Sequence, residues 1–193
     1  GIGRYQPDNG QASCLPCTPG MYSKLEGISE CIDCLAGRAS SLVARDTDCD
    51  TCVVGRHQPE NGSTACLKCI PGQYQMTEEQ HGCVECTVGR ASSLVARDTD
   101  CDTCVVGRHQ PESGMTACLN CIPGRHQPKV EQAECEICKK NTFAATAQQS
   151  SCTDCASGQY TTSTGSASCQ PCGAGSYGVG CKSCPLGFYR SAE

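Results

Sequence analysis

Apolar side chains in this chain show no helical periodicity; instead, one short repeat recurs along the whole sequence. Each repeat begins Cys-x-x-Gly-x-Tyr or His, continues with eight or nine polar residues, and closes with Cys-x-x before the next repeat. Cys69-Ile-Pro-Gly-Gln-Tyr74 opens one repeat, and Cys155-Ala-Ser-Gly-Gln-Tyr160 opens another. A fixed short period predicts stacked copies of a small element rather than a globular domain with one core.

The cysteines set the period. All 22 fall into eleven Cys-x-x-Cys pairs, and the first members of successive pairs are 17 or 18 residues apart until a last step of 12. We expect one continuous array over residues 1–193. Residues 34–85 and 86–137 form a duplicated three-repeat block, since 34 of 39 positions from Cys34 to Gly72 recur 52 residues later. Both ends fall inside a repeat, so we expect a window on a longer array, with Cys14 and Cys184 bonded outside it.

Two columns of residues accompany the cysteines. The fourth place of the repeat holds glycine, and its single exception is asparagine, the residue that best tolerates a left-handed backbone after glycine. The column therefore predicts a turn with positive φ; it comprises Gly20, Gly37, Gly55, Gly72, Gly89, Gly107, Gly124, Asn141, Gly158, Gly175 and Gly187. Two places later lie rings, interrupted by Ala39 and Ala91: Tyr22, His57, Tyr74, His109, His126, Phe143, Tyr160, Tyr177 and Tyr189.

The composition excludes a hydrophobic core. Leu, Ile, Val and Phe number only 26 of 193 residues, and the chain has no Trp. A content below ~20% of these residues is typical of disordered chains. Cross-links must therefore hold the fold, and small cores held by disulfides belong to oxidising compartments. We expect an extracellular protein, either secreted or on the cell surface.

The spacing favours one disulfide pattern. If the second cysteine of each pair bonds to the first of the next, each disulfide closes a loop of about 15 residues, worth ~3 kcal/mol in the chain-entropy model. Length varies only between pairs, which supports this pattern over bonding inside each Cys-x-x-Cys, although sequence alone leaves that alternative open. The pattern predicts Cys17–Cys31, Cys34–Cys49, Cys52–Cys66, Cys69–Cys83, Cys86–Cys101, Cys104–Cys118, Cys121–Cys135, Cys138–Cys152, Cys155–Cys169 and Cys172–Cys181.

The repeats opening at Cys69 and Cys155 resemble the ephrin-receptor-like cysteine-rich repeat. They are also similar to the single-disulfide submodule of tumour-necrosis-factor-receptor cysteine-rich domains. The resemblance extends over the whole chain. It implies a small disulfide-rich repeat protein, an elongated ladder of short irregular β-hairpins with almost no helix and no single core. Such repeats occur in receptor ectodomains, secreted matrix proteins and protist surface proteins, so the resemblance fixes the module better than its function.

Other uses of the cysteines and histidines fit the pattern less well. Zinc sites would consume the Cys-x-x-Cys pairs two at a time, yet the pairs are evenly spaced and nothing marks which two would share a metal. A thioredoxin-like site needs one such motif in a packed α/β domain. His57, His109 and His126 occupy the ring column, where a flat ring packed on a disulfide explains them; His81 lies in a polar loop. We predict no catalytic, cofactor-binding or metal-ligating residue, and no enzyme.

Carboxylates alternate around two cysteines, at Asp46, Asp48 and Asp50 and again at Asp98, Asp100 and Asp102. Alternating carboxylates occur in calcium loops, but the following glycine and the distal glutamate of an EF-hand are missing. We favour a solvated acidic edge. Arginines in the same repeats could pair with these acids between neighbouring rods, although exposed pairs are individually weak; they are Arg38, Arg45, Arg56, Arg90, Arg97 and Arg108.

Asn61-Gly62-Ser63 is the N-glycosylation sequon of the chain, and a Ser/Thr cluster at 161–168 is a candidate for O-linked sugars or a plain polar hairpin. The net charge of −5, with dispersed basic residues, argues against nucleic acid. No apolar run approaches the ~18 residues of a membrane span.

These features together indicate an extracellular structural protein, a disulfide-laddered rod used as a stalk, coat or fibril component. We expect it to associate with itself into a filament or bundle and to carry glycans. The alternative is the ligand-binding ectodomain of a cell-surface receptor, in which one repeat would depart from the others; Cys138-Lys-Lys-Asn141 is the clear departure.

Overall fold

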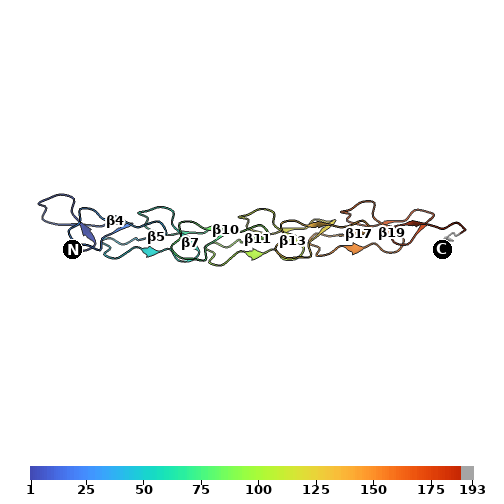
Figure 1. Cartoon of the computed structure of the whole chain (residues 1–193), viewed down its shortest axis with the longest axis horizontal. Coiled ribbons are helices and arrows are strands. Elements are labelled where there is room, and N and C mark those ends of the chain that lie inside the picture. The colour runs from blue at the N-terminus through green and yellow to red at the C-terminus, as the bar shows by residue number, and fades with distance from the viewer. Residues whose placement is uncertain (188–193) are drawn as a thin grey trace. The chain divides into compact units, whose positions relative to one another are not determined.

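The structure is a computed structural model that describes residues 1–187; Tyr189, the last ring of the predicted column, lies outside the described residues. Within that range there is no helix, and hence none that could cross a membrane. The 22 strands of the described residues pair into eleven antiparallel hairpins (Figure 1). The chain divides into two compact units, Gly1–Cys86 with Ser92–Cys101, and Thr87–Ala91 with Asp102–Glu193, and each is described by itself.

Every strand is two residues long. The hairpins of the first unit pair β1 (Arg4–Tyr5) with β2 (Leu15–Pro16), β3 (Met21–Tyr22) with β4 (Ile32–Asp33), β5 (Arg38–Ala39) with β6 (Asp50–Thr51), β7 (Arg56–His57) with β8 (Leu67–Lys68), and β9 (Gln73–Tyr74) with β10 (Val84–Glu85). Those of the second unit pair β11 (Arg90–Ala91) with β12 (Asp102–Thr103), β13 (Arg108–His109) with β14 (Leu119–Asn120), β15 (Arg125–His126) with β16 (Glu136–Ile137), β17 (Thr142–Phe143) with β18 (Thr153–Asp154), β19 (Gln159–Tyr160) with β20 (Gln170–Pro171), and β21 (Ser176–Tyr177) with β22 (Lys182–Ser183).

A glycine turn starts each hairpin. In the third hairpin the N–H of Arg38 donates to the carbonyl of Leu35 at 2.9 Å, and Gly37 between them has a φ of 81°. Only glycine adopts this left-handed conformation without cost. Asn141, the exception in the column, has a φ of 66°. The predicted positive φ is therefore confirmed at the described positions of the column.

Disulfides form the interior of each unit. Ten are present, with Cα atoms 5.3–5.8 Å apart, and each joins the second cysteine of one pair to the first of the next, as the spacing predicts. The second cysteines of most pairs are fully buried; Cys34 and Cys104, for example, are 0% exposed. Cys14 and Cys184 form no disulfide within the described residues. The fold is a small disulfide-rich repeat protein, because sulfur replaces the missing apolar core.

In the middle of each unit, three main-chain hydrogen bonds join one hairpin to the next. Between β5–β6 and β7–β8 the donor–acceptor pairs are Gly37 N to Gln58 O at 2.7 Å, Ser40 N to Ser63 O at 3.1 Å, and Gly62 N to Cys34 O at 2.7 Å. In the second unit the hairpins β13–β14 and β15–β16 repeat this set: Gly107 N to Gln127 O, Gln110 N to Gln132 O, and Glu131 N to Cys104 O. Because these bonds use backbone groups, they form whatever side chains the repeat carries.

Contacts also reach the second hairpin along. A Cβ added to Gly37 would lie 2.3 Å from the carbonyl oxygen of Glu79, so this glycine serves close approach as well as the turn. The loop residue at the contact is itself left-handed, with φ of 60° at Glu79. The sequence analysis missed this second left-handed column because half of it is not glycine: Gly10, Gly27, Ala44, Gly62, Glu79, Ala96, Gly114, Glu131, Gln148 and Gly165.

Candidate functional site

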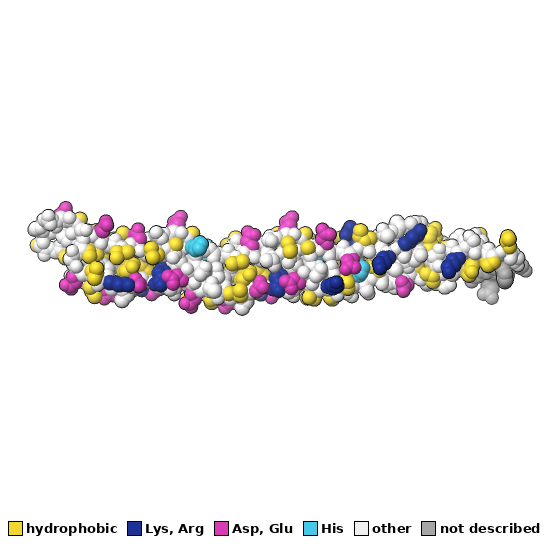
Figure 2. Space-filling model, viewed as in Figure 1, with side chains coloured by type: hydrophobic (Ala, Val, Ile, Leu, Met, Phe, Trp, Pro, Cys, Tyr) yellow, Lys and Arg dark blue, Asp and Glu magenta, His cyan; other side chains and the backbone are white. Residues whose placement is uncertain are grey.

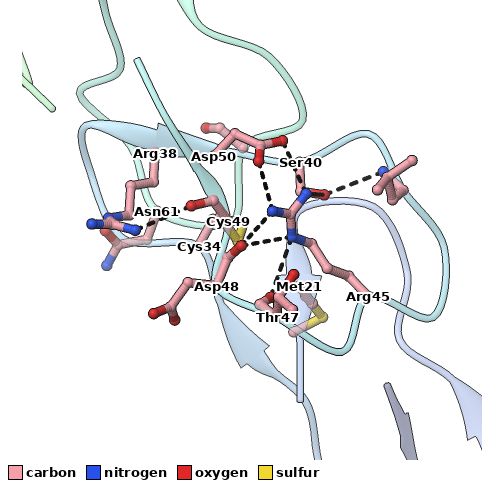
Figure 3. Close-up of a disulfide and its surroundings, with 12 residues drawn as sticks. Met21, Cys34, Arg38, Ser40, Arg45, Thr47, Asp48, Cys49, Asp50 and Asn61 are labelled. Carbon is pink, nitrogen blue, oxygen red and sulfur yellow. Dashed lines mark hydrogen bonds and ion pairs between the residues drawn. A yellow bond between two sulfur atoms is a disulfide. The ribbon is translucent and has the colours of Figure 1, made fainter. Parts of the chain in front are cut away.

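The candidate site lies in the longer hairpin that carries the alternating carboxylates. Its disulfide, Cys34–Cys49, spans 15 residues rather than the 14 of most others. The loop that this disulfide closes is filled by Arg45, whose side chain is only 8% exposed (Figure 3). A buried guanidinium must satisfy its five N–H donors within the protein, so its partners define the geometry of the loop.

The partners of Arg45 are loop carbonyls, a hydroxyl and a carboxylate. Its Nη1 donates to Asp50 Oδ2 at 2.9 Å and to Ser40 Oγ at 3.2 Å, and its Nη2 donates to Asp50 Oδ1 at 2.7 Å. Its Nε donates to the carbonyls of Thr47 at 3.2 Å and Asp48 at 2.8 Å. The bidentate contact with Asp50 has the planar geometry that arginine and carboxylate share. In the duplicated loop Arg97 bonds the Asp100 carbonyl at 2.9 Å and Ser92 Oγ at 3.2 Å.

In several of the shorter hairpins a glutamine side chain, instead of arginine, forms hydrogen bonds with the loop backbone. In β7–β8 the Nε2 of Gln58 donates to the carbonyl of Ala65 at 2.7 Å, while its Oε1 accepts from the N–H of Glu60 at 3.2 Å. The long hairpin has the shorter Ser40 at this place, and Arg45 supplies the missing donors. The sequence analysis missed this column, although its members share the place three residues after the glycine: Gln6, Gln58, Gln75, Gln110 and Gln127.

The carboxylates of Asp48 and Asp50 do not converge on one point. Figure 3 shows the side chains of Asp48 and Asp50 pointing away from each other, and each meets its own cation. Lys24 donates to Asp48 at 2.5 Å, and this hydrogen bond is the main reason that the pKa of Asp48 is lowered. Arg45 likewise lowers the pKa of Asp50. The acidic edge is solvent-exposed as expected, but two of its charges are already paired, which does not fit a calcium loop.

Two further arginines of the strands pair within the chain. Arg38 Nε donates to Glu79 Oε1 at 2.5 Å in the first unit, and Arg90 does the same to Glu131 in the second. These bonds lower the pKa of each glutamate. Within one chain, hairpins two apart in the same unit therefore use these charges, and the pairing of arginines with acids between neighbouring rods stays a prediction. Arg108, whose Nε is buried without a hydrogen-bond partner, has Gln148 where the other two have glutamate.

The histidines of the ring column pack on the following hairpin. His57 Nδ1 lies 3.2 Å from Cys83 Sγ, and His126 Nδ1 lies 3.1 Å from Cys152 Sγ, so these two rings contact a disulfide as predicted. His109 differs, since its Nδ1 lies 3.0 Å from the carbonyl of Ala133. Each of the first two rings comes close to both sulfurs of its disulfide. Those sulfurs are bonded to each other, so the clusters are not ligand sets in the oxidised chain.

The predicted sugar sites differ in exposure. Asn61 is exposed, and its Oδ1 accepts a hydrogen bond from the N–H of Ala36 at 2.7 Å. In the Ser/Thr cluster Thr161 is buried and its Oγ1 accepts from Asn141 N at 2.7 Å. The exposed hydroxyls of the cluster are those of Thr162, Ser163, Thr164 and Ser168.

Replacing Arg45 with alanine is expected to lower the free energy of unfolding of its hairpin by about 2 kcal/mol, because loop carbonyls then lose their donors in a buried place. Asp46→Asn in the same loop removes an exposed carboxylate and should change stability by less than about 0.5 kcal/mol. Denaturant unfolding of the oxidised variants measures both. Equal stability of the two variants would show that the guanidinium does not hold the loop.

Acid should weaken the same loop. The folded pKa of Asp50 is depressed by Arg45, so its contribution is complete above the unfolded value of about 3.9 and is lost as the pH falls through the folded pKa. Thermal unfolding of the oxidised chain should therefore show falling stability below about pH 4. An Asp50→Asn variant is expected to lose less over the same range, and identical pH curves would refute the pairing.

The comparisons agree with this repeat architecture. The sequence model of the family described as tyrosine-protein kinase ephrin type A/B receptor-like matches residues 3–44 and 126–172. No curated protein matches the chain.

Proposed function

Residues 3–44 and 126–172 are ephrin-receptor-like cysteine-rich repeats of an extracellular disulfide-rich module, and from this premise we propose that the chain is a non-catalytic spacer in a stalk, coat or fibril. Its function would be to keep the parts that it joins at a fixed distance outside the cell. The disulfides suit it to that place, because reducing compartments would open them.

The observation that carries this proposal is that main-chain hydrogen bonds join consecutive hairpins within each unit. The same three hydrogen bonds recur in both units, and the side chains at them vary. A fold built in this way gains length by copying repeats, as the near-identical blocks 34–85 and 86–137 illustrate. A ligand site, in contrast, would depend on particular side chains of one repeat.

Small-angle scattering tests the spacer directly. A globular chain of this length would have a radius of gyration of about 16 Å. We expect a clearly larger value for the oxidised chain, and a proportionate increase for a variant in which residues 34–85 are inserted once more. A value near the globular one, or no growth on insertion, would reject the proposal.

The spacer is proposed to associate with a second copy of itself through apolar loop tips. Leu42 and Val43 are 56% and 60% exposed although the loop behind them is fixed by Arg45, and Leu94 and Val95 repeat the feature in the same unit. Figure 2 shows that apolar side chains form several exposed patches on the face in view. A partner that meets both tips needs the same three-hairpin spacing, and a second copy of the chain has it. We propose that such a tip binds in an apolar pocket of about 350 Å³ on the second copy. The lining of this pocket includes Tyr22, Leu25, Ile28 and Ile32.

Sedimentation of the oxidised, glycan-bearing chain tests this contact. Serine at all four tip positions should leave the chain monomeric at concentrations where the unaltered chain associates. Val179→Ser removes an equally exposed apolar side chain outside the tips and serves as the control. An unaltered chain that stays monomeric, or a tip variant that associates equally well, would favour a solitary spacer.

Asn61 is the proposed carrier of an N-linked glycan. Its Oδ1 is held by Ala36, which leaves Nδ2, the atom that receives the sugar, without a partner among the described residues. Mass spectrometry before and after glycosidase treatment tests this site, with Asn61→Gln as the control.

A ligand-binding ectodomain is the second candidate. The hairpin at β17 carries two exposed lysines, Lys139 and Lys140, at places where the other repeats have no charged residue. Such a pair would suit an acidic protein partner. A binding screen in which the double change to serine abolishes capture of one cell-surface protein would favour this function over the spacer.

A further inference from the structure

In flexible chains an Asn-Gly sequence such as Asn61-Gly62 deamidates by an intramolecular reaction. The backbone nitrogen of the glycine attacks the asparagine Cγ, loses its proton to water, and expels the side-chain nitrogen as ammonia. Water then opens the resulting succinimide to aspartate or isoaspartate, so the reaction needs no other reagent. Glycine speeds the step because no Cβ hinders the approach.

Both reacting groups of Asn61-Gly62 are tied to the preceding hairpin. The Gly62 nitrogen donates its proton to the carbonyl of Cys34 at 2.7 Å, and the Asn61 carboxamide accepts from Ala36 N at 2.7 Å. The nucleophile and the electrophile are thus fixed by two separate hydrogen bonds on either side of the reacting bond. Gly62 also has a left-handed backbone conformation, with φ of 70°. It lies against Gly20, where the Cβ of any other residue would be 2.0 Å from the Gly62 carbonyl oxygen.

The chain itself indicates what the carboxamide is for. Where the turn has proline in place of Ala36, no N–H is available, and the residue at the place of Asn61 in the next hairpin is then apolar. Proline occurs at Pro19, Pro71 and Pro123, and the residues at the matching places are Val43, Val95 and Ala147. Asn61 faces a turn that has this donor, and so does Glu78, although Val130 facing Val106 shows that a donor does not require a polar partner.

We propose that Asn61-Gly62 is a conditional deamidation site, closed while the hairpin of Cys34–Cys49 is seated against it and open when that contact is lost. Deamidated Asn61 would then mark chains whose disulfide ladder has been damaged, because opening Cys34–Cys49 releases both the Gly62 nitrogen and the Asn61 carboxamide. The isoaspartate formed adds a backbone methylene and a charge at residue 61, directly before the left-handed Gly62 that contacts Gly20, so the loop could not return to its native position.

An unglycosylated chain, oxidised to the full ladder and incubated at neutral pH, tests the proposal by peptide mass spectrometry. Asn9-Gly10 is the internal reference, since in this chain its carboxamide and its Gly10 nitrogen have no partner among the described residues. We expect Asn61 to deamidate at least about fivefold more slowly than Asn9, the factor given by one hydrogen bond. Reduction and alkylation should bring the two rates together.

Ala36→Pro is the matched variant, because three other turns of the chain have proline at this place and glycine after it. It removes the N–H that holds Asn61 and should raise the rate at Asn61 by about fivefold while Asn9 keeps its rate. Equal rates at Asn61 and Asn9 in the oxidised chain would overturn the proposal, as would an Ala36→Pro variant that leaves the Asn61 rate unchanged. Disulfide mapping of the variant confirms that its ladder is intact.

Discussion

Replacing Gly20 with alanine will destabilise the first unit by about 2–4 kcal/mol, more than a turn defect alone. The new Cβ would lie 2.0 Å from the carbonyl oxygen of Gly62, two hairpins along the chain, so backbone must move. The φ of 87° adds the cost of a left-handed alanine, about 1 kcal/mol. Denaturant unfolding of the oxidised variant measures the loss, and hydrogen exchange should show the Gly62 amide losing protection.

Gly158→Ala separates the two causes. Gly158 has almost the same φ, 82°, but nothing lies within 4 Å of its added Cβ among the described residues. Gly158→Ala should therefore lower the free energy of unfolding by about 1 kcal/mol, which is the cost of a left-handed alanine alone. If both variants lose the same stability, the contact between hairpins two apart does not contribute, and the glycine column serves the turns alone.

Removing one disulfide should melt one hairpin and spare distant ones. The double variant Cys34→Ala and Cys49→Ala opens a 15-residue loop and is expected to cost about 3 kcal/mol. Hydrogen exchange should rise at Ser40 and Gly62, whose bonds connect this hairpin to the next, while the amide of Gln127 in the second unit keeps its protection. Nearest-neighbour coupling in repeats gives this local pattern.

Loss of protection along the entire chain after this one change would contradict it. Such a result would mean that the hairpins unfold as one cooperative body, as single-core domains do. A chain with every hairpin unaffected would instead show that the backbone bonds, not the disulfide, carry the stability of the repeat.

The sequence was sufficient for the features that repeat at one place in the chain. The glycine turns, the short hairpins and the absence of helix follow from the 17-residue period, because each depends on residues within one repeat. The even spacing of the pairs led to the ten disulfides found in the structure. The resemblance to ephrin-receptor-like repeats is confirmed in residues 3–44 and 126–172.

The features that were missed are contacts between hairpins two apart and the packing of side chains inside one loop. Arg38 and Glu79 are 41 residues apart, and no local periodicity connects them. From the sequence, Arg45 was interpreted as part of a charged edge. Its burial depends on the closed loop, in which the side chain of Ser40 is too short to fill the interior. The left-handed loop column escaped because tertiary contacts hold Ala44 and Glu79 in a conformation that their own preferences disfavour.

The central claim is that a ladder of disulfides between consecutive pairs replaces a hydrophobic core, and peptide mapping under non-reducing conditions tests it most directly. The account predicts cross-linked peptides for all ten pairs from Cys17–Cys31 to Cys172–Cys181, with no Cys-x-x-Cys bonded internally. Finding Cys66 joined to Cys69, or free thiols that hold zinc, would contradict it.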